Sequence, residues 1–342
     1  MITVIVSTYN RSAELRRMLL SLEACERPHG ESWELIVVDN NSADDTASVL
    51  AEFSGRSQLP LRPLFEGRQG KSYALNRAIR VAAGDVLAFT DDDVRVDSSW
   101  LAAIERAATR HPDALGFGGR IIADWQTPPP AWLGTGTSLG RTTGGVVAHN
   151  LGEAVLQLKP GVRPPAGANF FFRRAAFERH GLFREDLGPG TGTHGEDTEF
   201  VKRLVTAGER LLYVPDVVLQ HPVAPERVRR RYGLRWHFRL GRAAARGRGR
   251  RPNWRMIRGL PLFTLRRLID DVARFLVVAV AGTSFARHDA LQAVTYRVGV
   301  FYEYVSMPRS FDPTHYIPRL APAGHEDSVK PAGRDRREIG AG

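Results

Sequence analysis

Three consecutive aspartates, Asp91, Asp92 and Asp93, are the residues of this sequence best suited to chemistry. They directly follow an apolar run over 86–90 that is typical of a buried strand. Adjacent carboxylates repel one another unless a cation holds them, and hard divalent cations such as Mg²⁺ or Mn²⁺ prefer oxygen ligands. The cluster therefore predicts either a divalent-cation site that also takes a substrate phosphate, or a solvated acidic turn before the next helix.

Two other places in the sequence could contact a nucleotide. Asp39 ends a second apolar run, where a carboxylate could accept hydrogen bonds from a nucleobase or a ribose hydroxyl, or could simply form a turn. Gly67, Gly70 and Lys71 precede a helical pattern over 72–83. Backbone N–H groups and an ammonium group placed there could face a phosphate, although a Gly-Lys pair is also common in ordinary turns.

A glycine-rich stretch over 188–195 leads into acidic residues at the start of a predicted helix. Glu199 is expected to be structural, because Arg203 follows it at the i+4 position. Asp197 lies on a different helix face, where its carboxylate could take a proton from a hydroxyl group. His221 ends the last apolar run, so it is either a structural histidine or a metal ligand.

The elements that would position these residues alternate along the chain. Strand-like apolar runs occur at 2–8, 34–38, 61–65, 86–90 and 211–219, and helical patterns separate the first four of them. This alternation predicts an α/β fold with a largely parallel sheet. Between 124 and 165, proline and glycine interrupt the pattern, which indicates a long loop region containing Trp125 and Trp132.

The composition of the 342-residue chain limits its class. Cys25 is its single cysteine, so no internal disulfide forms. The chain starts with a strand-like run and shows no signal-peptide pattern, so a cytoplasmic protein is expected. The formal net charge of +11 favours a polyanionic partner, although an arginine bias of genomic origin would produce part of it.

Much of the positive charge lies beyond the last predicted strand. No acidic residue occurs between Glu226 and Asp270, and Trp236, Phe238 and Trp254 are interspersed among the arginines. Arginine–glycine runs bind single-stranded nucleic acids, but arginines mixed with aromatic residues suit an anionic membrane surface at least as well. A solvated basic face remains the third interpretation. An apolar run in the helix that follows is shorter than the ~20 residues that span a bilayer.

Taken together, the motifs resemble those of the family 2 glycosyltransferases, which have the GT-A fold. The resemblance covers roughly residues 2–225 and is carried by VSTYN at 6–10, IVVDNNS at 36–42, GKSYALN at 70–76, AGD at 83–85, TDDD at 90–93 and GEDTEF at 195–200. It implies a mixed, mostly parallel sheet flanked by helices, and an enzyme that transfers a hexose from a nucleotide sugar to an acceptor hydroxyl with inversion.

The resemblance also implies roles for individual residues. Asp197 would be the general base, and Asp93 and His221 would bind Mn²⁺ or Mg²⁺. The implied donor-binding residues are Thr8, Asn10, Asp39, Lys71, Asp91 and Asp92.

The expected partners follow from this assignment. A UDP-sugar is favoured as donor, with GDP- and dTDP-sugars as alternatives, and the acceptor would be a saccharide or a lipid-linked molecule of bacterial polysaccharide or glycolipid assembly. A seat on the inner face of the cell membrane would suit such an acceptor. The competing hypothesis is a non-catalytic protein that binds a nucleotide sugar or, less in keeping with the aromatic residues, a nucleic acid.

The expected domain organisation places the catalytic domain at 1–225. Residues 1–123 would form its nucleotide-sugar half and 124–225 its acceptor half. An Arg-rich amphipathic helical extension would follow over 226–318, with a disordered tail over 319–342.

Overall fold

The computed structural model describes residues 1–28, 32–130, 132–133, 145–250, 254–257 and 259–320. Its strands are β1 (Ile2–Thr8), β2 (Trp33–Asp39), β3 (Leu61–Phe65), β4 (Val86–Asp91), β5 (Arg95–Val96), β6 (Gly116–Trp125), β7 (Leu156–Gln157), β8 (Asn169–Arg173), β9 (Leu211–Val223), β10 (Met256–Ile257) and β11 (Leu260–Pro261). Its α-helices are α1 (Ser12–Glu23), α2 (Thr46–Arg56), α3 (Lys71–Val81), α4 (Trp100–Arg110), α6 (Arg174–His180), α7 (Glu196–Thr206), α8 (Arg230–Arg248), α9 (Leu262–Ala281) and α10 (Ser284–Ser306).

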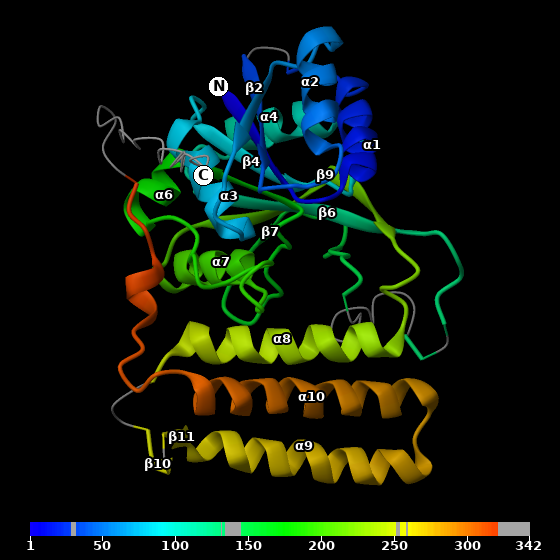
Figure 1. Ribbon diagram of the computed structural model, residues 1–342, viewed down its shortest axis with the longest axis vertical. Helices are drawn as coiled ribbons and strands as arrows, with labels where there is room; N and C mark the ends of the chain where they lie inside the picture. The colour runs from blue at the N-terminus through cyan, green and yellow to red at the C-terminus, as the bar shows by residue number, and fades with distance from the viewer. Residues whose placement is uncertain (29–31, 131, 134–144, 251–253, 258, 321–342) are drawn as a thin grey trace, which may run out of the picture.

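One mixed sheet forms the centre of the molecule, with the strand order β3-β2-β1-β4-β8-β6-β9-β5 and β7 paired to β9 (Figure 1). The first four strands in this order run parallel to their neighbours. Strand β8 is antiparallel to both β4 and β6, while β6 and β9 are again parallel. The predicted α/β fold, a mixed sheet flanked by helices, is thus confirmed.

The apolar strands form two hydrophobic cores because successive side chains of a strand point to opposite faces of the sheet. Val4 and Val6 of β1 belong to one core, which includes residues of α1, α2 and α4. Ile5, between them, belongs to the other core with residues of α3, α6 and α7. A strand buried on both faces has no polar alternation, which explains the continuous apolar run at 2–8.

Phenylalanines of the second core link β4 to α7. The ring of Phe89 lies 5.3 Å from that of Phe170 on β8 and 5.7 Å from that of Phe177 on α6. Phe177 in turn stacks on Phe200 of α7 at 4.7 Å. These contacts connect the strand that ends at the aspartates to the helix that begins beside Asp197, so the two are held in a fixed relation.

Three long helices form a separate layer below the sheet, in the order α8, α10, α9 (Figure 1). Helices α8 and α10 approach closely: an added Cβ on Gly241 would lie 2.0 Å from the carbonyl oxygen of Tyr296, and one on Gly299 would lie 2.1 Å from that of Phe238. Arg242 of α8 also pairs with the buried Glu303 of α10 at 2.7 Å. In the described part of the chain, no helix is both long and apolar enough to cross a membrane.

Some elements differ from those expected. Helix α8 was not singled out in the sequence, because its arginines and glycines hide the helical pattern. Helix α4 and strand β6, between the aspartates and the long loop, were also not identified. Of the predicted tail, residues 319–320 are described, and the expectation for 321–342 falls outside the described residues.

Candidate active site

The carboxyl ends of β1, β2 and β4 meet at one edge of the sheet. Thr8 of β1 is in register with Asp39 of β2, and Ser7 is in register with Asp91 of β4. Ligands of open α/β sheets bind beyond this edge. A cavity of about 680 Å³ lies there, and its walls come from these strand ends, the 163–168 segment, the glycine-rich loop and α8.

The predicted donor-binding residues of β1 and β2 are placed differently from one another. Thr8 is buried and lines the cavity. Asp39 is also buried, accepts a hydrogen bond from the backbone three residues on, and does not line the cavity. Asn10 has a φ of 51° and its side-chain oxygen accepts a hydrogen bond from Ala43, so it joins two loops outside the cavity. Asn40 reaches the cavity wall instead.

Asp91, Asp93 and His221 form a group that could hold a metal ion. One ligand atom from each lies within 4.8 Å of the others. The ring of His221 is almost fully buried, and its Nδ1 lies 3.1 Å from the carbonyl oxygen of Pro222. That contact uses the Nδ1 proton and leaves Nε2 as the ring nitrogen that could bind a metal.

The Nε2 atom of His221 lies 3.4 Å from Oδ1 of Asp93 and has no hydrogen-bond partner among the described residues. In the neutral imidazole the Nε2 lone pair faces this carboxylate, and a cation between the two groups would stabilise that arrangement. Oxygen and imidazole ligands together suit Mn²⁺ or Mg²⁺, with Mn²⁺ the more tolerant of nitrogen. The residues therefore fit a divalent metal, and Asp91 joins the two ligands predicted from the sequence.

Two arginines that the sequence did not single out also hold the aspartates. Arg11 lies 3.1 Å from Asp92 and 2.9 Å from Asp93. Arg227 contacts Asp93 at 3.1 Å. Burial raises the pKa of Asp92 to about 7, with Asp93 adding to the rise and Arg11 opposing it. Asp92 is therefore close to its titration midpoint at neutral pH.

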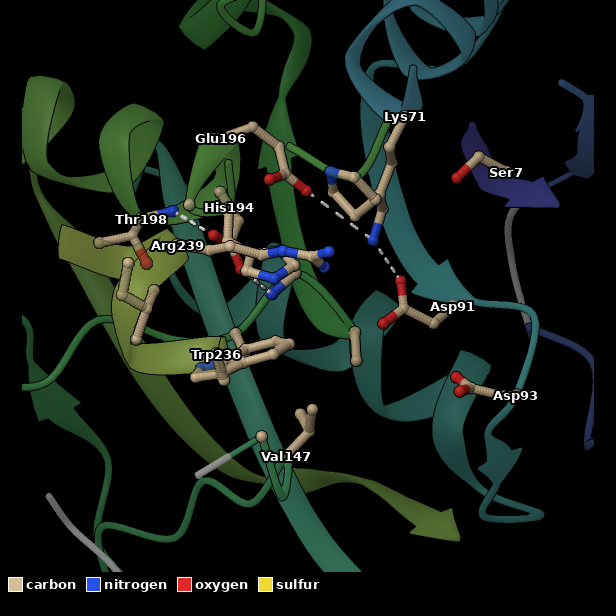
Figure 2. Close-up of a pocket in the computed structure, with 18 of the residues that line it drawn as sticks. Ser7, Lys71, Asp91, Asp93, Val147, His194, Glu196, Thr198, Trp236 and Arg239 are labelled. Carbon is tan, nitrogen blue, oxygen red and sulfur yellow. Dashed lines mark hydrogen bonds and ion pairs between the residues drawn. The ribbon is translucent and has the colours of Figure 1, made fainter. Parts of the chain in front are cut away.

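Lys71, at the start of α3, lies between two carboxylates in the cavity wall. Its Nζ is 2.5 Å from Asp91 and 4.0 Å from Glu196 (Figure 2). Burial alone would lower the pKa of Lys71, but Asp91 and Glu196 outweigh it and raise that pKa. For Glu196, burial and the neighbouring Asp197 raise the pKa to about 7 against the effect of Lys71. Like Arg11 and Arg227, Glu196 is a residue of the site that sequence reasoning left out.

Asp197 lines the same cavity at the first turn of α7. Its Oδ2 accepts a hydrogen bond of 2.8 Å from the backbone of Gly167, and its Oδ1 accepts one of 2.6 Å from Thr198. These two donors fix the carboxylate at the wall. Glu199 instead pairs with Arg203 at 2.8 Å, as its i+4 spacing predicts.

The glycine-rich loop packs directly against the start of α3. The backbone N–H of Lys71 donates to the carbonyl oxygen of Pro189 at 3.0 Å, and the Ser72 hydroxyl donates to that of Leu187. A Cβ on Gly190, whose φ is 95°, would lie 2.8 Å from the Cα of Gly70. Glycines in this loop are thus required by the close approach as well as by backbone conformation.

Helix α8 closes the cavity on the side away from the sheet. The indole ring of Trp236 stacks on the imidazole of His194 with 4.3 Å between their centres, and Arg239 lies beside them (Figure 2). Burial lowers the pKa of His194 to about 4, and Arg239 adds to this effect, so the ring is neutral at pH 7. Trp125 and Trp132 pack in a small cluster and do not line the cavity.

This cavity therefore combines a carboxylate–imidazole group suited to a metal at one end with a fixed carboxylate, Asp197, at the other. A family model described as glycosyl transferase family 2 matches residues 3–181. The chain belongs to this family.

Named relatives of this glycosyltransferase are similar along most of their length. Glycosyltransferase AglE of Haloferax volcanii is 27% identical over 248 residues, which cover 70% of this chain and 72% of the relative. The succinoglycan biosynthesis protein ExoM of Rhizobium meliloti is 29% identical over 244 residues, 70% of this chain and 73% of the relative.

Solved structures agree on the GT-A fold of this family 2 glycosyltransferase. The mannosyltransferase PcManGT of Pyrobaculum calidifontis, in complex with GDP-Man and Mn²⁺, has a TM-score of 0.58 at 21% identity, covering 89% of this chain and 87% of its own. Residues 1–349 of TarS from S. aureus, in complex with UDP, have a TM-score of 0.51 at 17% identity. The match covers 87% of this chain and 90% of the TarS chain.

Proposed function

We propose that this glycosyltransferase moves a hexose from a nucleoside-diphosphate sugar to an acceptor hydroxyl with inversion, and that it uses Mn²⁺ or Mg²⁺. The observation that carries the proposal is that Asp91 and Asp93, which form a candidate metal group with the buried His221, line one cavity with Asp197. Residues 1–225 would form the catalytic domain, and α8 of the 226–318 extension would complete its cavity.

In this proposal Thr8, Asn10 and Asp39 hold the base and ribose side of the donor. Asp39 and Asn10 would act by shaping the loop beside the cavity, since their side chains bond to that loop. Lys71 and Asp92 would lie along the nucleotide sugar. A metal held by Asp91, Asp93 and His221 would stabilise the negative charge that develops on the departing diphosphate.

Asp197 would act as the general base. The acceptor hydroxyl attacks the anomeric carbon, its proton passes to a carboxylate oxygen of Asp197, and the bond from the anomeric carbon to the diphosphate breaks. A single displacement with the base opposite the leaving group inverts the anomeric configuration. The N–H groups of Gly167 and Thr198 keep the carboxylate oriented for this step.

Related proteins support the substrate classes. PcManGT binds GDP-Man and TarS binds UDP in their structures, so a nucleotide sugar is the proposed donor, with a UDP-sugar favoured over GDP- and dTDP-sugars. ExoM is named for succinoglycan biosynthesis, and another relative, from Trichormus variabilis, is a beta-monoglucosyldiacylglycerol synthase. A saccharide or lipid-linked acceptor in bacterial polysaccharide or glycolipid assembly is proposed accordingly.

A thermal-shift panel of nucleotide sugars, each with and without Mn²⁺, tests the donor and the metal together. One nucleotide class should stabilise the protein only when Mn²⁺ is present, and the nucleoside monophosphate should do so less. Stabilisation by a single-stranded oligonucleotide and by no nucleotide sugar would contradict the proposal and favour the nucleic-acid alternative.

Helix α9 supports peripheral binding of the enzyme to a membrane surface. It is the outermost helix of the lower layer (Figure 1), and its only fully buried residue is Thr264. A row of exposed apolar side chains runs along it at helical spacing: Leu262, Leu265, Ile269, Val272, Leu276 and Val280. Exposed arginines at 266, 267 and 274 share the helix. An apolar row beside cationic side chains suits a helix lying in the interface of an anionic bilayer.

Co-sedimentation with liposomes tests the proposed binding to the inner face of the membrane. The protein should sediment with vesicles that contain anionic lipid and not with neutral vesicles, and the double variant Leu276→Asp/Val280→Asp should lose the binding. Self-association of the wild type that disappears in the same variant, without vesicle binding, would show instead that α9 pairs with a second copy.

A further inference from the structure

The cations of the cavity fall into two classes. Among the described residues, Arg11, Lys71, Arg163, Arg227 and Arg239 line it. Arg11, Lys71 and Arg227 each contact at least one of the aspartates within 3.1 Å. Arg163 and Arg239 form no hydrogen bond or ion pair with any described residue, although five carboxylates line the same cavity.

These two arginines, which have no partner among the described residues, belong to wall segments next to Asp197. Arg163 begins the wall segment that donates to Asp197 through Gly167. Arg239 extends from α8 and lies beside His194 (Figure 2). His194 precedes Asp197 by three residues in the chain. The paired cations, by contrast, surround the aspartates at the proposed metal end.

The positive potential of both arginines acts on neighbouring neutral rings. Burial lowers the pKa of His149 to about 4, and Arg163 adds to this effect. Arg239 does the same for His194, after burial. Burial also lowers the pKa of Arg163 itself, with no carboxylate to offset it. The partly buried guanidinium of Arg163 is costly without a counter-ion, and the exposed Arg239 lines the same cavity, so this positive site is poised to take an anion.

We propose that Arg163 and Arg239 bind an anionic group, a phosphate or a carboxylate, on the acceptor. The inference rests on the proposed function, because it takes Asp197 as the base that faces the acceptor. The planar guanidinium donates two parallel hydrogen bonds to either kind of anion. At the other end of the cavity, the metal group and Lys71 would bind the donor diphosphate.

Binding of small acceptor probes to the full-length protein, saturated with UDP and Mn²⁺, tests the inference by calorimetry. The probes are decyl phosphate, neutral decyl β-D-glucoside, methyl phosphate and methyl β-D-glucuronide. Wild type should bind the anionic probes more tightly than the glucoside. Arg163→Gln and Arg239→Gln should each weaken anion binding about tenfold and leave glucoside and UDP binding within about twofold.

Arg235→Gln, an exposed change on the same helix as Arg239, is the matched control and should leave all constants unchanged. Methyl phosphate separates recognition of the phosphate from that of the alkyl chain, and the glucuronide tests a carboxylate. Weaker UDP binding with unchanged probe binding would assign both arginines to the donor and overturn the inference. Equal binding of anionic and neutral probes by wild type would also overturn it, whereas Mn²⁺-dependent UDP binding would still support the proposed function.

Discussion

The Nζ atom of Lys71 lies 2.5 Å from Oδ1 of Asp91, and Asp91 also belongs to the candidate metal group with Asp93 and His221. The lysine and a bound metal would therefore share one carboxylate. Burial alone would raise the pKa of Asp91, but Lys71 more than offsets this and holds that pKa below its usual range. Lys71 keeps Asp91 ionised before any metal arrives.

Replacing Lys71 with Met should destabilise the metal-free protein by about 3 kcal/mol, because it leaves Asp91 buried without its partner. Mn²⁺ should restore more stability to the variant than to wild type, because the ion supplies the missing positive charge. Urea unfolding with and without Mn²⁺ measures both effects. Lys159→Met, at an exposed loop position, is the control, and equal Mn²⁺ effects in variant and wild type would contradict the shared-carboxylate arrangement.

Asp197→Asn should lower the transfer rate by about 100-fold or more, because an amide cannot accept the acceptor proton. Mn²⁺-dependent nucleotide binding should be retained, since Asp197 makes no contact with the metal group. Steady-state rates together with nucleotide titration separate the two effects. Glu199→Gln is the control two residues away: it loses only the pairing with Arg203 and should keep its turnover. Near-normal turnover of Asp197→Asn would show that another group is the base.

The part of the site that could be predicted from sequence lies at strand ends. Asp39 and Asp91 end apolar runs that predict buried strands, and parallel strands bring their carboxyl ends together, although Asp39 itself does not line the cavity. Arg11 and Arg227 could not be found this way. They reach the aspartates from 81 and 134 residues away in sequence, and neither follows an element whose register fixes its side chain.

The same limit applies to the wall formed by α8. The helix falls within the predicted basic extension, but nothing in an arginine–glycine pattern indicates that Trp236 and Arg239 line the cavity. Their placement depends on the close approach of α8 and α10 at Gly241 and Gly299, which is a tertiary contact. The proposed acceptor side of the site is therefore the part that only the structure reveals.

Asp93→Ala and His221→Gln should each abolish the stabilisation by Mn²⁺ plus nucleotide, because each removes one of three ligands from the metal group. In wild type a ligand at about 100 times its Kd adds about 2.7 kcal/mol to the free energy of unfolding, and EDTA should remove that gain. Thermal unfolding with Mn²⁺, with EDTA and with nucleotide alone provides the measurement. Asp113→Asn, at an exposed ion pair with Arg210, should behave like wild type. A full Mn²⁺ response in His221→Gln would exclude the histidine as a ligand.

The free energy of unfolding of Glu196→Gln should exceed that of wild type increasingly as pH rises from about 4.5 to 7. Burial and Asp197 raise the folded-state pKa of Glu196 to about 7 from an ordinary 4.5, so the folded state binds more protons than the unfolded chain in this window. Ionising Glu196 therefore costs wild-type stability as pH rises, and a neutral glutamine avoids that cost. The difference should reach about 3 kcal/mol above pH 7.

Urea unfolding of both proteins at intervals between pH 4.5 and 8 measures this difference. Buried histidines such as His194 act in the opposite direction over the same range, since the lowered pKa makes stability rise with pH, and comparing two proteins that share them cancels their effect. Glu178→Gln, on the exposed side of α6, controls for the loss of one negative charge. A pH-independent difference for Glu196→Gln would mean that Lys71 keeps Glu196 ionised throughout, and the cavity would then hold one more fixed negative charge at neutral pH.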